Sequence, residues 1–244
     1  MLHKLFARRK AKGASSRSDY VGPELNAFDR ETLALVRPHT MTSQQRVQAL
    51  ILATRYVVRR KIAGAFVECG VWRGGSMLAA ARTLRDTGDT GRDLYLFDTF
   101  SGMPTPGPED VRAHDGAPAA ALLKEPGEDQ TRAEASLDIV KATMALSGHD
   151  LARIHYVVGK VEQTIPAAAP PSIALLRLDT DWYESTRHEL EYLFPRLAIG
   201  GVLIIDDYGW WAGARRAVDE YFGAHSAPIL LNIIDDTGRV GVRV

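Results

Sequence analysis

Two short apolar runs that each end on aspartates constrain the fold of this chain more than any other feature. Residues 173–178 lead into Asp179 and, two residues later, Asp181, whereas residues 202–205 lead into Asp206 and Asp207. Such runs, rich in Ile, Leu and Val and bounded by turn residues, predict buried strands of a parallel sheet. Ligands of open parallel sheets bind beyond the carboxyl ends of the strands, so we expect these acids to meet at the functional edge.

The meeting of these carboxylates predicts a metal site. Carboxylates that are brought together repel one another unless a cation compensates their charge. Mg²⁺, a hard cation that prefers oxygen ligands, is the simplest compensation. The alternative is that Asp179 and Asp206 are helix N-caps, which are common where a strand leads into a helix. Paired acids at two strand ends favour the metal site.

Length and composition indicate one α/β domain. The 244 residues suffice for a sizeable domain, and the 30 basic residues balance the 30 acidic ones, so nothing indicates a nucleic-acid partner. No apolar run is long enough for a transmembrane segment. Cys69 is the single cysteine, which excludes disulfides within the chain and cysteine-based zinc sites. The N-terminal segment is basic but lacks the apolar core of a secretory signal, so we expect a cytoplasmic protein.

A glycine-rich turn follows another predicted strand, Ala65 to Cys69. The turn, residues 70–75, has the spacing G-x-x-x-G-G and leads into a predicted helix over residues 76–85. It lets the backbone approach a ligand at a helix N-terminus, and it differs from the G-x-G-x-x-G dinucleotide fingerprint. Glu68 at the strand end suits a ligand with an ammonium group or hydroxyls. A tight turn that binds no ligand is the alternative.

Two further segments contain candidate ligand contacts. The strand predicted over residues 94–97 ends on Asp98, where an acid is well placed to hold ribose hydroxyls. Before the glycine turn, Thr42 or Ser43 can cap a helix that begins at Gln44. Thr40 and Thr42 are also candidate ligand contacts, although the residues alone favour plain capping.

Other segments carry structural predictions. Residues 104–130 are rich in Pro, Gly, Ala and acids, which predicts an irregular lid or binding loop, or plain disorder. Residues 131–146 have the apolar spacing of one helix. Gly200 and Gly201 predict a turn before the strand that ends on the paired acids. Residues 229–244 predict two strands joined by a D-D-T-G turn, whose aspartates belong to the turn rather than to the metal site.

The order of these elements is similar to that of class I S-adenosylmethionine-dependent methyltransferases, which have an α/β, Rossmann-like, mostly parallel seven-stranded sheet with a C-terminal antiparallel hairpin. Over about residues 38–225 the chain resembles the macrocin (TylF-type) O-methyltransferase family, in the strings FVECGVWRGGS, DTFSGMP, LRLDTDWYESTRHELEYLFPRLAIGGVLIIDDYG and RRAVDEYF. Members of this family use Mg²⁺ to methylate sugar hydroxyls of macrolide antibiotics and related glycosylated molecules. The resemblance implies one methyltransferase domain over residues 38–244 with an insert at 104–130, after a basic tail and N-terminal cap over residues 1–37.

The resemblance also implies a role for each matching residue. The contacts implied for S-adenosyl-L-methionine are Thr40, Thr42, Glu68, Gly70, Gly74 and Ser76 around the methionine part and Asp98 at the ribose. The implied metal ligands are Asp179, Asp206 and Asp207. Asp181 lies beside them, and either Asp179 or Asp181 is a candidate catalytic base.

We therefore expect a Mg²⁺-dependent O-methyltransferase that acts on a hydroxyl of a sugar or glycosylated small molecule. Family members often assemble, so a homo-oligomer is a further expectation. One alternative is a catechol-type enzyme acting on a vicinal diol, which a flat aromatic pocket near Trp182, Trp210 and Trp211 would favour. Those tryptophans could equally stack on sugar faces or lie in the core. The other alternative is a non-catalytic cofactor-binding module, against which the intact set of acids argues.

Overall fold

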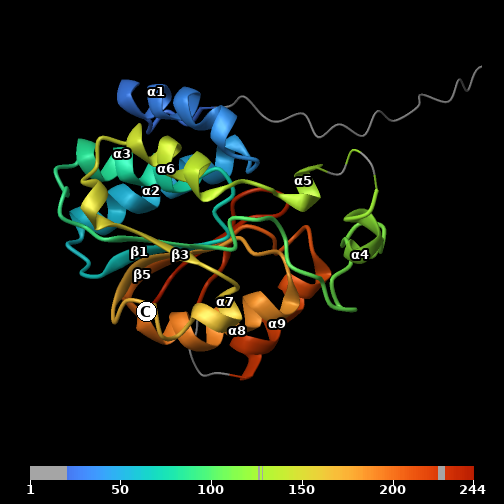
Figure 1. Cartoon of the computed structure of the whole chain (residues 1–244). Coiled ribbons are helices and arrows are strands. Elements are labelled where there is room, and N and C mark those ends of the chain that lie inside the picture. Colours follow the sequence, from blue (N-terminus) through green and yellow to red (C-terminus); the bar gives the residue numbers. More distant parts are fainter. Residues whose placement is uncertain (1–20, 126, 128, 225–228) are drawn as a thin grey trace, which may run out of the picture.

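The chain is built around one twisted sheet. The computed structural model describes residues 21–125, 127, 129–224 and 229–244, so only residues 21–37 of the predicted basic tail and N-terminal cap are described. The sheet order is β3-β2-β1-β4-β5-β7-β6 (Figure 1). The strands are β1 (Ala65–Cys69), β2 (Leu94–Asp98), β3 (Ile154–Val158), β4 (Ile173–Leu178), β5 (Leu197–Ile205), β6 (Asn232–Ile233) and β7 (Arg239–Val242). Strands β1 to β5 run parallel, whereas β7 pairs antiparallel with β5 and with β6, which confirms the predicted sheet.

Helices cover both faces of this sheet. In Figure 1, α1, α2, α3 and α6 lie over one face, and α7, α8 and α9 lie over the other. The longer helices are α1 (Ala27–Val36), α2 (Gln44–Arg59), α3 (Gly75–Asp86), α6 (Leu137–Ala145), α8 (Tyr183–Leu193) and α9 (Ala212–Ala224), and the single-turn helices are α4 (Ala119–Leu122), α5 (Asp129–Arg132) and α7 (Val161–Thr164). The central strands β1 and β4 are buried along their whole length, because helices cover them on both sides.

The helix predicted over residues 131–146 is wrong as a single element. The chain leaves α5 at Arg132, takes a left-handed conformation at Ala133 with φ of 47°, and starts α6 only at Leu137. The Arg132 carbonyl accepts from the Met103 backbone N–H, which ties the break to the loop after β2. Ser136 caps α6 by accepting from the backbone of residue 139. Local capping therefore overrides the apolar spacing.

The turn predicted at Gly200 and Gly201 is also wrong, because both residues lie inside β5. The C-terminal segment extends the pairing there. The Gly200 N–H donates to the Arg243 carbonyl at 2.7 Å, and the Arg243 N–H donates to the Gly201 carbonyl at 2.9 Å. Strand β5 is consequently longer than its apolar run, and its less buried first half pairs with the C-terminal segment.

Residues 104–125 are ordered by contacts with the rest of the domain, and we call them the lid. Val111 bridges Pro118, and Arg112 bridges Trp211 of the segment that follows β5. The lid packs on a small separate core, which we call the lid core. Its buried members are Ala119 and Leu122 of the lid and Trp182, Trp211 and Ala214 of the chain beneath it. The lid is thus a folded cover seated on the chain that follows β4 and β5.

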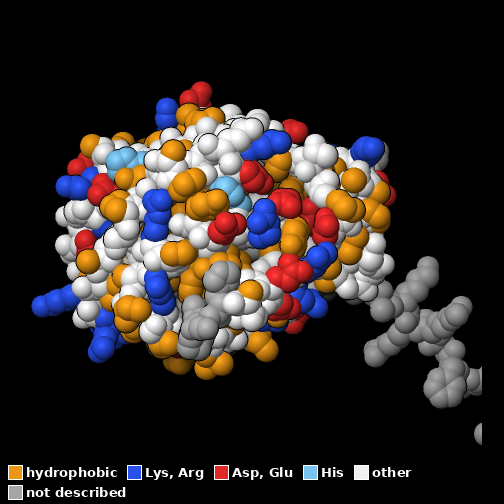
Figure 2. Space-filling model, turned by 90° about the horizontal axis from the view of Figure 1, so that it is seen from below, with side chains coloured by type: hydrophobic (Ala, Val, Ile, Leu, Met, Phe, Trp, Pro, Cys, Tyr) orange, Lys and Arg blue, Asp and Glu red, His pale blue; other side chains and the backbone are white. Residues whose placement is uncertain are grey.

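The surface carries charges of both signs. On the face with α7, α8 and α9, Figure 2 shows basic and acidic side chains among apolar ones, and no basic stripe crosses it. This distribution agrees with the balanced composition. Among the described helices, none is both long and apolar enough to cross a bilayer.

Candidate active site

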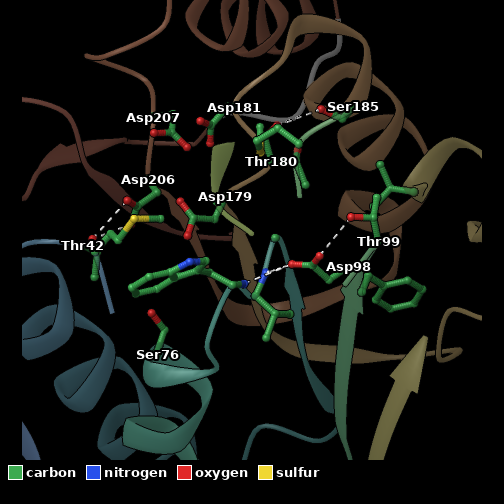
Figure 3. A pocket seen from close by; sticks show the side chains of 18 of the residues that line it. Thr42, Ser76, Asp98, Thr99, Asp179, Thr180, Asp181, Ser185, Asp206 and Asp207 are labelled. Carbon is green, nitrogen blue, oxygen red and sulfur yellow. Dashed lines mark hydrogen bonds between the residues drawn. The ribbon is translucent and has the colours of Figure 1, made fainter. Parts of the chain in front are cut away.

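A cavity of about 370 Å³ opens at the carboxyl ends of the parallel strands. The strand order reverses between β1 and β4, and open α/β sheets bind ligands at such a point. Most of the predicted site residues line the cavity, namely Thr40, Thr42, Gly70, Ser76, Asp98, Asp179, Asp181, Asp206 and Asp207. Figure 3 shows the four aspartates that follow β4 and β5 gathered at one end, with Thr42 beside Asp206 and Asp98 at the other end.

Glu68 and Gly74 are not among the described residues that line the cavity. The Glu68 side chain is buried, and its Oε1 accepts from Nη1 of Arg177 at 2.7 Å. Gly74 caps α3 with φ of 85°, a left-handed conformation that glycine adopts without strain. In this structure one residue holds an arginine behind the site and the other shapes the turn, so direct contact of either with the cofactor stays a prediction.

Gly70 lies where β1 meets the end of β4. Its φ is 81°, and a Cβ placed on it would collide with the backbone carbonyl of Asp179. A glycine is therefore needed for the two strand ends to lie this close.

The Asp98 carboxylate holds the loops on either side of it. Its Oδ2 accepts from the backbone N–H groups of Val71 at 2.6 Å and Trp72 at 3.1 Å, and its Oδ1 accepts from that of Phe100 at 2.8 Å. Both Trp72 and Phe100 have positive φ, of 47° and 52°. Asp98 thus fixes two strained turns at the cavity wall, and strain of this kind gathers at binding sites.

Three carboxylates at the other end of the cavity are arranged to hold a cation. One oxygen from each of Asp179, Asp181 and Asp207 can be chosen so that all three lie within 4.8 Å of one another. Oδ2 of Asp207 is buried and has no hydrogen-bond partner among the described residues. An orphaned buried oxygen beside two further carboxylates fits a hard divalent cation such as Mg²⁺.

Asp206 has a different environment from its neighbours. Two arginines that the sequence analysis did not consider, Arg177 and Arg46, form ion pairs with its two oxygens, and the Thr42 hydroxyl lies 3.0 Å and 3.1 Å from them. Arg177 also pairs with Asp179 at 2.6 Å. A signal for Arg177 was present in the sequence, because a charged residue inside a buried apolar strand needs buried partners.

The pKa values of these acids separate accordingly. Burial raises the pKa of Asp206, but Arg177 and then Arg46 outweigh it, so this pKa lies below its usual range. Desolvation, followed by the charge of Asp179, raises the pKa of Asp181 to about 7. Desolvation also raises the pKa of Asp179 and of Asp207. Asp206 is therefore the acid of this group that loses its proton most readily.

Asp181 is held in place by the chain around it. Its backbone has φ of 69°, and its Oδ2 accepts from Nε1 of Trp211 at 2.9 Å. The preceding Thr180 donates its hydroxyl to the buried Glu189 of α8 at 2.9 Å. The turn that carries Asp179 and Asp181 is thus fixed from both sides, so the two carboxylates have defined positions.

Comparison with known proteins assigns the chain to a family. The model of the family described as macrocin-O-methyltransferase (TylF) matches residues 7–241. The chain belongs to the TylF family. The match is wider than the resemblance read from the strings, and it agrees with the sheet and the acids described above. As a TylF-family protein, the chain is an S-adenosylmethionine-dependent O-methyltransferase.

Curated relatives of this TylF protein include three O-methyltransferases. It is 34% identical over 206 residues, 82% of this chain and 74% of the relative, to the 8-demethyl-8-(2,3-dimethoxy-alpha-L-rhamnosyl)-tetracenomycin-C 4'-O-methyltransferase of Streptomyces olivaceus. It is 31% identical over 75% of its length to the demethyldecarbamoylnovobiocin O-methyltransferase of Streptomyces niveus, of which 67% is covered. It is 30% identical over 82% of its length to the mycinamicin III 3''-O-methyltransferase of Micromonospora griseorubida, of which 76% is covered.

Solved structures support the same fold. The O-methyltransferase NovP superposes with a TM-score of 0.74 at 28% identity, covering 84% of this chain and 82% of NovP. The calicheamicin methyltransferase CalS11 superposes with a TM-score of 0.60 at 23% identity, covering 92% of this chain and 94% of CalS11, and this likeness concerns the fold alone.

Proposed function

We propose that this TylF protein transfers a methyl group from S-adenosylmethionine to a sugar hydroxyl of a glycosylated small molecule, and that the transfer depends on Mg²⁺. The name of the Streptomyces olivaceus relative places a rhamnosyl group on its substrate, which supports a sugar acceptor. The observation that carries the metal requirement is the cluster of Asp179, Asp181 and Asp207 with an orphaned buried oxygen.

We assign the two halves of the cavity to the two reactants. The half above β1 and β2 takes the cofactor, with Thr40, Ser76 and Asp98 on its wall. Asp98 is the predicted ribose contact, and its loops bring backbone groups to the same place. The half beyond β4 and β5 takes the acceptor, because the acids that would bind the metal lie there.

The metal ligands in this proposal are Asp179, Asp206 and Asp207. Asp206 contributes a carboxylate whose low pKa keeps it ionised at neutral pH. Its oxygens are engaged by Arg46, Arg177 and Thr42, so metal binding requires it to release one of these donors, of which the Thr42 hydroxyl is the uncharged one. The cluster of Asp179, Asp181 and Asp207 defines a competing ligand set that exchanges Asp206 for Asp181.

The chemistry requires an acceptor oxygen in line with the methyl group and free of its proton. Mg²⁺, when bound, supplies a positive charge that lowers the pKa of an acceptor hydroxyl. Asp181 takes the proton, because it lies beside the metal ligands and a cation bound there keeps its carboxylate ionised at neutral pH. Trp211 holds the Asp181 carboxylate in position through its indole N–H. A C–O bond forms as the C–S bond breaks, and the proton remains on Asp181.

The alternative acceptors receive less support from the structure. Trp182 and Trp211 are 3% and 2% exposed and meet edge to face, so they lie in the lid core rather than forming a flat slot for a catechol. The metal-type acid cluster argues against a non-catalytic module. Cytoplasmic location and homo-oligomer formation remain predictions of the sequence.

Calorimetric titration of the full chain tests the proposal. S-adenosylmethionine is titrated with Mg²⁺ present and again with a chelator, and Mg²⁺ is titrated separately. Methyl transfer to a panel of glycosides is then measured under both conditions. We expect cofactor binding in both titrations, and methylation only when Mg²⁺ is present.

Other results would contradict separate parts of this proposal. Turnover that persists at full rate in chelator would remove the metal requirement. Methylation of catechols but of no glycoside would remove the sugar acceptor. An absence of cofactor binding would contradict the assignment of the cavity itself.

A further inference from the structure

The three tryptophans that follow β4 and β5 have different environments. Trp182 and Trp211 are buried in the lid core with ring centroids 5.0 Å apart. Trp210, the direct neighbour of Trp211, is 42% exposed and lines the cavity. An exposed aromatic ring at the wall of a cavity offers an apolar face to a ligand that enters the cavity.

The backbone fixes this exposed ring relative to the acids. The Trp210 N–H donates to the Asp207 carbonyl at 3.0 Å, and the Trp210 carbonyl accepts from the Ala113 N–H of the lid at 2.8 Å. The imidazole of His114 lies against the indole with ring centroids 5.5 Å apart. The lid and the turn after β5 together hold one aromatic surface, which we call the Trp210 platform.

The location of the Trp210 platform excludes a role in holding the adenine of the cofactor. The segment after β5 lies beyond β4, whereas Asp98 ends β2 on the other side of β1. Trp210 therefore belongs to the half of the cavity that contains the acids. A group resting on it would lie in the same half of the cavity as these carboxylates.

We propose that the Trp210 platform is the subsite for the sugar ring that is methylated. A pyranose presents a face of C–H groups that packs on an aromatic ring, while its hydroxyls reach polar partners at its edge. Trp72 also lines the cavity and is partly exposed, but it follows β1 beside Asp98, whereas Trp210 follows the acids of β5. This inference rests on the proposed sugar acceptor and adds the residue that selects it.

Saturation-transfer difference NMR on the full chain tests the platform with methyl α-L-rhamnopyranoside as the probe. The wild-type protein should saturate the ring C–H protons, both with and without Mg²⁺ and S-adenosylhomocysteine. Trp210→Ala should weaken the glycoside affinity by about tenfold, whereas Trp210→Phe, which keeps an aromatic face, should stay within about threefold. Tyr192→Ala is the matched control, because Tyr192 is 36% exposed and is not among the described residues that line the cavity.

For a glycoside from the panel that the wild-type protein methylates, Trp210→Ala should raise the KM for the glycoside by about tenfold as well. It should leave S-adenosylmethionine binding unchanged. Unchanged saturation or KM in Trp210→Ala would overturn the subsite, and so would a wild-type protein that saturates catechol but no glycoside. Calorimetry on the same samples separates the two proposals. If the glycoside signal depends on Trp210 but the protein binds no cofactor, the Trp210 platform is supported. The same result contradicts the assignment of the other half of the cavity to S-adenosylmethionine.

Discussion

Asp181 and Asp206 lie in the same acidic group but are surrounded by different charges. Asp206 faces two guanidinium groups, which keep it ionised. Asp181 faces other acids and one indole N–H, and its pKa of about 7 lets it exchange a proton near neutral pH. This difference agrees with the proposed roles, in which Asp206 supplies a permanent charge to the proposed metal site and Asp181 accepts a proton.

Two conservative substitutions distinguish these roles. Asp206→Asn should weaken Mg²⁺ binding by about tenfold or more, because it removes a charged ligand. Asp181→Asn should leave Mg²⁺ affinity within about threefold and abolish most turnover, because the acceptor proton loses its base. Calorimetry and steady-state kinetics on both variants measure these effects. The opposite order of Mg²⁺ affinities would make Asp181 the third ligand.

For individual residues, the sequence predicted which side chains lie together at the site, but not which of them form ion pairs. The acids, Thr42 and Asp98 follow from strand ends and resemblance, because topology alone brings strand ends together. The ion pairs of Arg46 and Arg177 depend on where an N-terminal helix packs against a central strand. Such a contact joins residues 160 positions apart, as in Arg46 and Asp206, and no local pattern encodes it.

Among the elements, the lid shows how a polar segment acquires a defined structure. Asp110 is 2% exposed, and its carboxylate accepts from the backbone N–H groups of Tyr183 and Gly107, both at 2.7 Å. The contact with Tyr183 also gives an acceptor to the first backbone N–H of α8, which has no partner within the helix. The composition of residues 104–130 predicted only an irregular loop. The contacts that order the lid are made with Trp182 and Trp211, which are distant in the sequence, so the composition of the segment does not reveal them. The strands, whose apolar runs are continuous, were predicted within a few residues.

Asp110→Ala should loosen the lid. The variant leaves two buried N–H groups without their acceptor, which costs about 1–3 kcal/mol for each group when it stays dry. Hydrogen exchange of the lid amides should therefore accelerate, and the midpoint of thermal unfolding should fall. Asp115→Ala is the control, because Asp115 is an exposed lid acid that pairs with Arg112. Equal exchange in Asp110→Ala and the wild-type protein would show that other contacts hold the lid.

For the whole molecule, the acidic site couples stability to pH. The folded-state pKa of Asp181 is about 7, above the value of about 3.9 for an unfolded aspartate, so the folded state binds this proton more tightly. The stability contributed by this residue is present below about pH 4 and is lost as the pH rises towards 7. A bound cation restores this lost stability, because it compensates the negative charge of the carboxylates after they have lost their protons.

Saturating Mg²⁺ should therefore raise the unfolding temperature more at about pH 8 than at about pH 6. Differential scanning calorimetry at both pH values, with and without Mg²⁺, measures this difference. Asp181→Asn should reduce it, because the substituted residue does not titrate. A Mg²⁺ effect that is larger at the lower pH would contradict the coupling.

The seating of the lid on the turns after β4 and β5 has a consequence for how such an enzyme changes its acceptor. The acids are held by the sheet and by α8, whereas His114, beside the exposed Trp210 ring, belongs to the lid. We expect substitutions within residues 104–125 to change first how the Trp210 ring is held, and to reach the Asp181 carboxylate only through Trp211. The lid is thus the part of this chain in which a change of sequence is expected to alter acceptor binding while the sheet that carries Asp179, Asp206 and Asp207 stays unchanged.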